Sequence, residues 1–296
     1  MNGGTAMPEV MQFLFSGLTV GAIYALVALG FTIIYNASEV VNFAQGEFVM
    51  IGGMATFVLY AAGVPLWAAA PLAIVAAVVV GLALHKLAIE PARGASVVAL
   101  IIITIGASIF LRGVAQIVFD KQYHRFPAFS GETPFHVLGA TLLPQSVWVM
   151  AGAACAFALL WQFFERTLAG KAIAATAGNR LAARLVGIDT DRMIALSFAL
   201  SAALGAVAGV LITPITLTSY DVGTLLALKG FAAAMLGGMG NPLGAVVGGL
   251  VVGVIEQFSA GMLSSKYKDA VAFIVILLTL FVLPHGLFGR GRIERV

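Results

Sequence analysis

The sequence predicts an all-α polytopic membrane protein, and three observations point to it. Hydrophobic residues make up 61% of the 296 residues and charged residues only 10%, with a mean hydropathy of +1.04, whereas a soluble domain carries about 25% charged residues. Several apolar stretches approach the roughly 20 residues that a membrane-spanning helix needs. The basic residues collect in the connections of one face. We therefore expect membrane lipid, and no nucleic acid, around the chain.

Six apolar stretches are long enough to span a bilayer: residues 10–34, 66–84, 97–119, 147–164, 193–213 and 271–289. We interpret the first as a retained helix, because no Lys or Arg precedes Lys86 to form the basic region of a secretory signal. Residues 48–62 are short for a span, and residues 222–258 hold two short apolar runs that either span twice or include a re-entrant segment. The expected total is about eight or nine transmembrane helices, broken or re-entrant ones included.

The distribution of positive charge predicts the orientation of the chain. If the N-terminus lies outside, ten of the sixteen Lys and Arg residues fall in loops of one face and four in loops of the other. Cytoplasmic loops carry the excess of positive charge. We therefore expect the N-terminus outside, the C-terminus in the cytoplasm, an outside loop at 120–146 and a cytoplasmic loop at 165–192. All of these belong to one expected transmembrane domain, residues 1–296.

The sequence gives little support for enzymatic chemistry. The segment around Lys171 lacks the upstream glycine spacing and the following Ser or Thr of a Walker A phosphate loop. The four histidines show no metal-ligand spacing with Cys or acidic residues, and no serine stands in a nucleophile elbow. We expect no catalytic residue, cofactor or metal. The one cysteine, Cys155, lies in an apolar run and is expected to be buried.

Polar residues cluster where the second apolar segment begins. Asn42, Gln45 and Glu47 lie within the stretch NFAQGEFVMIGGM. They could occupy an interfacial turn between two helices, or they could open a broken helix onto a water-filled route. Non-helical backbone inside a membrane is tolerated only where protein or water satisfies it. On the second interpretation these three side chains line a translocation pathway.

The end of the same stretch returns later in the chain. MIGGM, which holds Gly52 and Gly53, reappears as MLGGM, which holds Gly237 and Gly238. Chance is one explanation, because Gly and Met are common here. The other is an inverted repeat, whose broken helices run in opposite directions near a pseudo-twofold axis. We then expect the two glycine pairs to face each other across the pathway.

Glycine pairs at four-residue spacing punctuate other apolar segments. Gly17 with Gly21 and Gly249 with Gly253 are two examples. Such pairs let helix backbones approach closely within a bilayer. Close helix packing is therefore the expected role of these residues.

Three more charged residues fall inside apolar segments, namely Arg112, Lys229 and Glu256. Nothing in the sequence pairs any of them, or pairs Glu47. The expectation for Arg112 and Lys229 is that the long side chain reaches out toward the interface. Glu256 lies near the end of its segment, where a capping or interfacial role is expected.

The predicted cytoplasmic loop reads as two short helices. Gly178 ends the first, Asn179 caps the second, and Gly187 stops it. Ala182, Ala183 and Val186 fall on one side of the second helix, and Arg180 and Arg184 form a basic rim on another. Such a helix suits a groove on a partner protein, although a plain amphipathic helix lying among lipid headgroups would have the same pattern.

Three stretches resemble the permease subunits of bacterial branched-chain amino acid ABC importers, of the LivH type. They are GLTVGAIYALVALGFTIIYNASEVVNFAQGEFVMIGGM (17–54), GKAIAATAGNRLAARLVGID (170–189) and LKGFAAAMLGGMGNPLGAVVGGLVVGVIEQF (228–258). The resemblance implies a LivM-like second permease in a heterodimer, two cytoplasmic ATPase subunits and a periplasmic solute-binding protein.

The resemblance also places an ATPase coupling segment in the predicted cytoplasmic loop. Its residues here are Gly170, Asn179, Ala182, Ala183, Leu185 and Gly187. The chain departs from the family pattern at Gln45, where many relatives have His, and at Asn241 and Pro242, where Ser is common. Either departure could bear on the choice of solute or on nothing.

The expected function is a permease subunit of a binding-protein-dependent ABC importer in the bacterial inner membrane. It would pass branched-chain amino acids, or related small amino acids and amides, by alternating access. A stand-alone secondary transporter for a small polar solute is the alternative, and it predicts paired acids or ion sites in mid-span. A membrane scaffold is a third class, and it predicts no transport defect on deletion.

Overall fold

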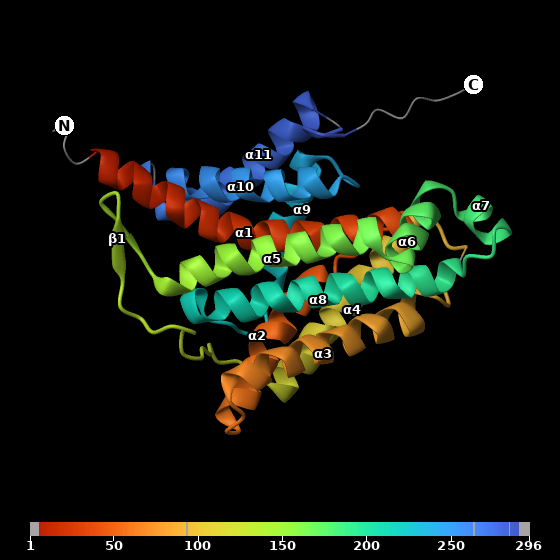
Figure 1. Cartoon of the computed structure of the whole chain (residues 1–296), viewed down its shortest axis with the longest axis horizontal. Helices are drawn as coiled ribbons and strands as arrows, with labels where there is room; N and C mark the ends of the chain where they lie inside the picture. Colours follow the sequence, from red (N-terminus) through yellow and green to blue (C-terminus); the bar gives the residue numbers. More distant parts are fainter. Residues whose placement is uncertain (1–5, 93, 263, 284, 290–296) are drawn as a thin grey trace.

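The computed structural model describes residues 6–92, 94–262, 264–283 and 285–289, which form an almost wholly helical bundle (Figure 1). The helices are α1 (Ala6–Ser38), α2 (Gln45–Ala61), α3 (Leu66–Leu84), α4 (Val97–Val118), α5 (Pro144–Arg166), α6 (Leu168–Gly178), α7 (Arg180–Leu185), α8 (Thr190–Thr216), α9 (Val222–Gly237), α10 (Pro242–Met262) and α11 (Lys268–Val282). A π-helical turn, His85–Ile89, extends α3, and a 3-10 turn, Ser265–Tyr267, precedes α11. The predicted all-α polytopic class is confirmed.

Helix α1 lies at the centre of the bundle. It packs against α5, α8, α9 and α10, and every residue from 21 to 34 is buried. Its sequence carries no charge from residue 10 to 38, and a helix that is apolar all round is stable only when other apolar groups cover it on every side. Glu39, with φ at 59°, adopts a left-handed conformation that ends the helix.

Six helices of the described residues are long and apolar enough to cross a membrane. They are Met7–Ser38, Leu66–Ile89, Val97–Val118, Pro144–Arg166, Thr190–Thr216 and Pro242–Met262. The first five contain the predicted spans at 10–34, 66–84, 97–119, 147–164 and 193–213, apart from the last residue of the third. Within residues 222–258, where the sequence left open two spans or a re-entrant segment, α10 is long enough to span the membrane. The preceding helix, α9, is a shorter apolar helix.

The sixth predicted span, residues 271–289, is wrong in its second half. Helix α11 ends at Val282, and the chain then turns back toward the end of α9. The backbone N–H groups of Leu287 and Phe288 donate to the carbonyls of Leu236 and Gly237, at 2.8 and 3.0 Å. These bonds satisfy carbonyl groups at the C-terminus of α9 that have no partner within the helix.

Polar residues fix where several helices begin. Ser96, Thr167, Asn179 and Asp189 each accept, through a side-chain oxygen, a hydrogen bond from the backbone N–H three residues further on. Such N-caps satisfy donors that the first helical turn leaves unpaired. They start α4, α6, α7 and α8, so the short helices between α5 and α8 are set by local sequence.

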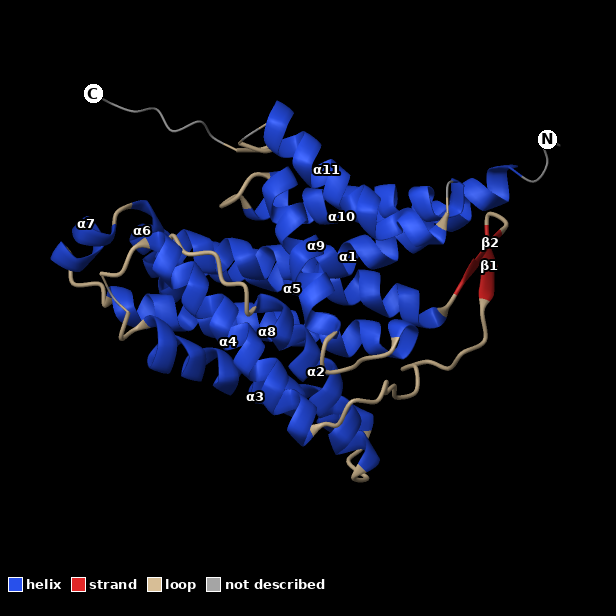
Figure 2. Cartoon of the chain, turned by 180° about the vertical axis from the view of Figure 1, so that it is seen from behind, coloured by secondary structure: helices blue, strands red, loops and turns tan. Residues whose placement is uncertain are grey.

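The long loop between α4 and α5 contains a β-hairpin that the sequence did not predict. β1 (Phe135–Val137) pairs antiparallel with β2 (Ala140–Leu142) (Figure 2). Leu138 and Gly139 form the turn, both with positive φ, as a two-residue hairpin turn requires. The N–H of Thr141 donates to the side chain of Gln12 at 2.7 Å, so the hairpin is tied to the start of α1.

The same loop is also tied to the connection between α8 and α9. His124 and Thr218 exchange two backbone hydrogen bonds, both 2.8 Å long. Asp120 accepts a hydrogen bond from the N–H of Gln122 and lies 3.0 Å from the His124 ring. These interactions, the first above all, lower the pKa of the Asp120 carboxyl from its ordinary value.

Glycines let α1 and α10 pack with their backbones in contact, as the glycine pairs predict. A Cβ atom on Gly17 would lie 2.7 Å from the Cα of Val254, and one on Gly21 would lie 2.8 Å from the Cα of Leu250. A Cβ atom on Gly253 would overlap the backbone of Gly21. Any larger residue at these positions must push the helices apart, because backbone cannot move aside as a side chain does.

Replacing Gly253 by Leu should therefore destabilise the protein severely. The expected loss exceeds the roughly 1–3 kcal/mol of ordinary overpacking, and it is measured as a fall of the thermal unfolding midpoint in detergent. Gly106→Leu is the matched control, since Gly106 is also in a helix but a Cβ atom there would meet nothing within 4 Å. Equal midpoints for the two variants would contradict the close contact.

Candidate translocation pathway and coupling segment

The N-terminal ends of α2 and α9 meet inside the bundle. A Cβ atom on Gly46 would overlap the carbonyl of Gly223, and one on Gly223 would lie 2.5 Å from the carbonyl oxygen of Gly46. The two helix starts thus touch through their backbones, and only glycine fits at either position. We call this contact the α2/α9 junction.

From the junction the two helices run in opposite directions. α2 lies along α8, where Gly52 meets Ala206 and Gly53 meets Thr213. α9 lies along α1 and reaches the end of that helix, where Asn36 donates to the carbonyl of Gly240 at 2.8 Å. Because α1 and α8 are antiparallel (Figure 1), α2 and α9 are antiparallel too. This is the relation that the repeated motif predicts.

The two motifs do not face each other, so that part of the prediction is wrong. Gly52 and Gly53 pack on α8 near one end of the bundle. Gly237 packs on Gly244 at the start of α10, and a Cβ atom on Gly238 would lie 2.6 Å from the N atom of Gly289. MIGGM lies in the middle of α2 and MLGGM at the C-terminal end of α9, and it is the N-termini of these helices, not their glycine pairs, that come together.

The segment before α2 is non-helical and buried deep in the protein. α1 ends at Ser38, whereas α2 begins at Gln45, which lies beside Gly30. Gly30 is eight residues before Ser38, or about 12 Å along the helix. The chain therefore runs back into the bundle before it becomes helical, which is the broken-helix geometry rather than the interfacial turn.

Protein groups pair several backbone groups of this buried non-helical segment, although Nδ2 of Asn42 has no hydrogen-bond partner. Thr104 of α4 accepts from the N–H of Phe43 at 3.2 Å and donates to the carbonyl of Val41 at 3.3 Å. Asn42, fully buried, accepts from the N–H of Ala44 at 3.1 Å. An unpaired backbone group here would cost several kcal/mol in an apolar environment. The sequence did not single out Thr104.

Gln45 joins three helices at the start of α2. Its side chain is fully buried. Its amide donates to the carbonyl of Ser201 in α8 at 3.1 Å, and its oxygen accepts from the hydroxyl of Ser201. That hydroxyl also lies 2.9 Å from the carbonyl of Gly30 in α1. Gln45 therefore fixes the depth at which α2 begins.

Glu47 is paired, contrary to the expectation from sequence. Its Oε1 accepts from the hydroxyl of Ser108 at 2.7 Å and lies 3.4 Å from Nε of Arg112. Both partners are on α4. Arg112 was expected to reach toward the interface, but its side chain is 31% exposed and turns to the buried carboxylate. A buried charge without a partner is too costly to persist. On this ground, the sequence could have suggested that Glu47 and Arg112, two charges within apolar segments, pair with each other.

A second buried cluster joins the helices on the other side of α1. Nζ of Lys229 lies 2.9 Å from Oε1 of Glu256 and 2.6 Å from Oδ1 of Asp269. The hydroxyl of Tyr24 donates to Oε2 of Glu256 at 2.7 Å. The expected snorkelling of Lys229 and capping role of Glu256 are therefore both wrong. We call these four residues the α9–α11 charge cluster.

The two short helices of the 165–192 loop form as predicted. Gly178 ends α6, and Asn179 caps α7 by accepting from the N–H of Ala182 at 2.9 Å. Gly187, with φ at +88°, stops α7 in a conformation that favours glycine. A Cβ atom on Gly170 would lie 2.6 Å from the Cα of Phe164, so this glycine lets α6 fold back onto α5.

The exposed surface of α7 matches the predicted face only in part. Ala183 is only 3% exposed and faces its own chain, whereas Val186 is 77% exposed as part of that face. Leu181 and Leu185 are also exposed, at 69 and 80%. We call Leu181, Leu185 and Val186 the coupling patch. Arg184 holds α7 onto α8 through a 2.8 Å hydrogen bond from its Nε to the hydroxyl of Thr190.

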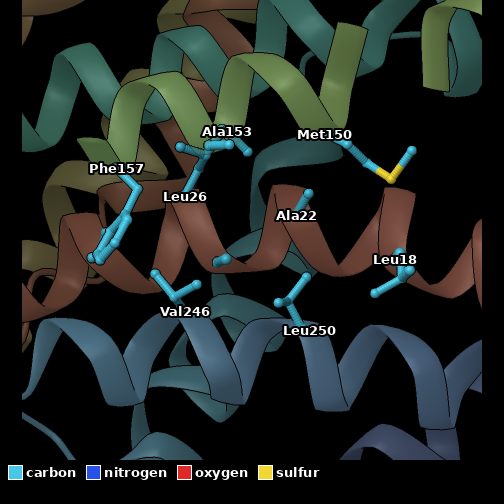
Figure 3. A pocket seen from close by; sticks show the side chains of 11 residues that line it. Leu18, Ala22, Leu26, Met150, Ala153, Phe157, Val246 and Leu250 are labelled. Carbon is cyan, nitrogen blue, oxygen red and sulfur yellow. The ribbon is translucent and has the colours of Figure 1, made fainter. Parts of the chain in front are cut away.

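An apolar cavity of about 280 Å³ lies between α1, α5 and α10. Its lining is formed by side chains such as Leu26, Met150, Phe157 and Leu250 (Figure 3). No hydrogen-bonding side chain lines it, so it offers nothing to orient a polar solute.

Cys155, which lies on α5, is exposed. The prediction that this cysteine is buried is therefore wrong.

Comparison with known proteins decides the family. Residues 13–280 match the family described as "Branched-chain amino acid transport system / permease component". The chain is 34% identical to the high-affinity branched-chain amino acid transport system permease protein LivH of Escherichia coli (strain K12), over 97% of both chains. It is also 34% identical to BraD of Pseudomonas aeruginosa, a permease protein of the same kind of system, over 98% of this chain and all of the relative.

The chain belongs to the branched-chain amino acid permease family. A more distant match is the ribose import permease protein RbsC of Escherichia coli (strain K12), 26% identical over 88% of this chain and 89% of that protein. Membership confirms the predicted permease subunit of an ABC transport system, a transport protein and not an enzyme. It also agrees with the multi-pass architecture of apolar helices.

In this permease, the pairing of Glu47 with Arg112 should be measurable as stability. Arg112→Met leaves the buried carboxylate with Ser108 alone and should cost about 3 kcal/mol, detected as a lower unfolding midpoint in detergent. The double variant Glu47→Gln/Arg112→Met should recover most of the loss, because a neutral amide still accepts from Ser108.

The control for this pair is an exposed one. Arg125 pairs with Glu132 at 3.2 Å, with side chains 57 and 66% exposed, and such a pair contributes little. Arg125→Met should leave the midpoint nearly unchanged. If Arg112→Met behaved like Arg125→Met, the buried pair would have no energetic role.

Proposed function

We propose that this permease subunit passes branched-chain amino acids, or related small amino acids and amides, across the bacterial inner membrane by alternating access. The observation that carries the proposal is the α2/α9 junction, where two helix N-termini meet inside the bundle and the helices leave in opposite directions. Transporters commonly build their route where broken helices meet at mid-depth. The solute class follows from the names of the relatives LivH and BraD.

The residues around the junction would frame this route. Gln45 and Glu47 hold the start of α2 on α8 and α4, and Asn42 caps the turn that leads into it, through the hydrogen bonds described above. Gly52 and Gly53 allow α2 to lie close along α8, Gly237 does the same for the end of α9 on α10, and Gly238 packs on the segment after α11. A helix packed backbone to backbone shifts as a unit.

The energy would come from partner subunits. We propose that two cytoplasmic ATPase subunits bind the coupling patch, that a LivM-like permease completes a heterodimer, and that a periplasmic binding protein delivers the solute. Three exposed apolar side chains on one short polar-flanked helix favour a protein groove over water. Gly170, Asn179, Ala182, Ala183, Leu185 and Gly187 would act together, with Leu185 in contact with the ATPase and the others shaping α6 and α7.

A stand-alone secondary transporter is the second candidate, because it predicts paired acids in mid-span and two acids, Glu256 and Asp269, meet at Lys229. Proteoliposomes separate the two functions. Liposomes with the complete complex should take up L-leucine only when ATP and the binding protein are supplied. Uptake by this chain alone, driven by an imposed ion gradient, would instead support the second candidate.

Leu185→Glu should weaken ATPase binding and uncouple transport. A charge in an apolar contact must be desolvated, so we expect at least a tenfold loss of co-purified ATPase subunits, or about 1.4 kcal/mol. Leu138→Glu is the control, since Leu138 is similarly exposed, at 69%, but lies in the hairpin at the opposite end of the bundle (Figure 1). If the Leu185→Glu variant co-purified with the normal amount of ATPase subunits, the coupling patch would not be part of the interface.

The proposed orientation places the N-terminus and hairpin outside and α6 and α7 in the cytoplasm. In a Cys155→Ala background, Leu138→Cys should react with a membrane-impermeant maleimide in whole spheroplasts. Leu181→Cys should react only after the membrane is opened. The reverse pattern would mean that the chain is inserted the other way round.

A further inference from the structure

The α9–α11 charge cluster borders a cavity of about 360 Å³. This volume lies within the roughly 300–1,000 Å³ of small-molecule sites. α1, α8, α9, α10 and α11 all contribute to its lining. Its lining combines aliphatic side chains, Ile23, Ile212, Leu225 and Leu226, which we call the apolar wall, with the charged Lys229 and Asp269. A solute with one apolar end and one charged end would match this combination.

The charged side has binding capacity left. An ammonium group has three donors, and Lys229 directs two at Glu256 and Asp269. Both oxygens of Glu256 are occupied, by Lys229 and Tyr24. Asp269 uses Oδ1 for Lys229, which leaves Oδ2 free, and its side chain is 42% exposed. The charge cluster therefore offers a solute one donor of Lys229 and Oδ2 of Asp269, and Lys268, Gln257 and Thr216 add further polar groups to the lining.

The cavity lies close to the proposed route. Val222, the first residue of α9, lines it, and the next residue, Gly223, forms the α2/α9 junction. Tyr24 is the nineteenth of the 33 residues of α1, so the cluster lies about halfway along the central helix. A solute that passes the junction would meet this cavity.

We propose that this cavity is a transit site for an α-amino-acid zwitterion, whose ammonium group binds Asp269, whose carboxylate binds Lys229, and whose aliphatic side chain lies on the apolar wall. The inference rests on the proposed function. Binding is weak, because Lys229 and Asp269 already pair with each other in the empty site and the solute must replace that attraction. Weak binding is appropriate for a transit site, because the solute must dissociate from it during transport.

Binding to the purified permease complex in nanodiscs tests the site without the binding protein. Saturation-transfer NMR would compare L-leucine with 4-methylpentanoate, which keeps the side chain and carboxylate but lacks the ammonium group. Asp269→Asn should weaken leucine binding at least tenfold, whereas 4-methylpentanoate should bind at least as well as before, because Lys229 no longer pairs with Asp269. Asp120→Asn, an exposed aspartate of the α4–α5 loop, is the control and should alter neither.

Two results would overturn the proposal: unchanged leucine binding by Asp269→Asn, or an equal loss for both compounds. If Asp269→Asn does not fold, Leu225→Trp replaces it, because Leu225 is 51% exposed and a larger ring there fills the apolar wall. It should weaken both compounds, and unchanged binding of either would again overturn the site. ATP-dependent leucine uptake by the wild-type complex is scored separately, so loss of the proposed function is distinguished from loss of this site.

Discussion

The backbone contact between Gly46 and Gly223 is the constraint on which the rest of this permease depends. Two helix N-termini carry unpaired N–H groups and like partial charges, so bringing them together inside an apolar bundle is unfavourable by itself. The surrounding helices compensate: Gln45 and Ser201 anchor one start, and Thr104 and Asn42 satisfy the non-helical approach to it. α1, buried throughout its middle, supplies the apolar surface on which both short helices lie.

Buried charge divides the molecule into two polar centres around that contact. Glu47 and Arg112 join α2 to α4, while Lys229, Glu256 and Asp269 join α9 to α10 and α11. Each centre thus attaches one broken helix to its outer neighbours. Pairs of this kind rarely add stability relative to apolar residues, but they penalise any arrangement that separates them. Their effect is to restrict how α2 and α9 are placed.

The long spans could be predicted from the sequence, because a stretch of about twenty apolar residues without charge is stable in a bilayer only as a membrane-spanning helix. It also located the caps of the short helices, since Asn179 and Gly187 act locally. It failed where partners are distant in sequence. Glu256 and Asp269 meet Lys229 only after two changes of chain direction, and no periodicity reveals that. Ala183 was misplaced because six residues of helix are too few to define a buried face, and α11 was extended because hydropathy does not register a turn at Gly286.

The turn after α11 has a consequence for the order of assembly. The carbonyls at the end of α9 are satisfied by the N–H groups of Leu287 and Phe288, which follow α10 and α11 in the sequence. Chains are made from the N-terminus at about 5–20 residues per second. The end of α9 therefore keeps unpaired carbonyls until both later helices have been made. This end of α9 is completed only after α10 and α11.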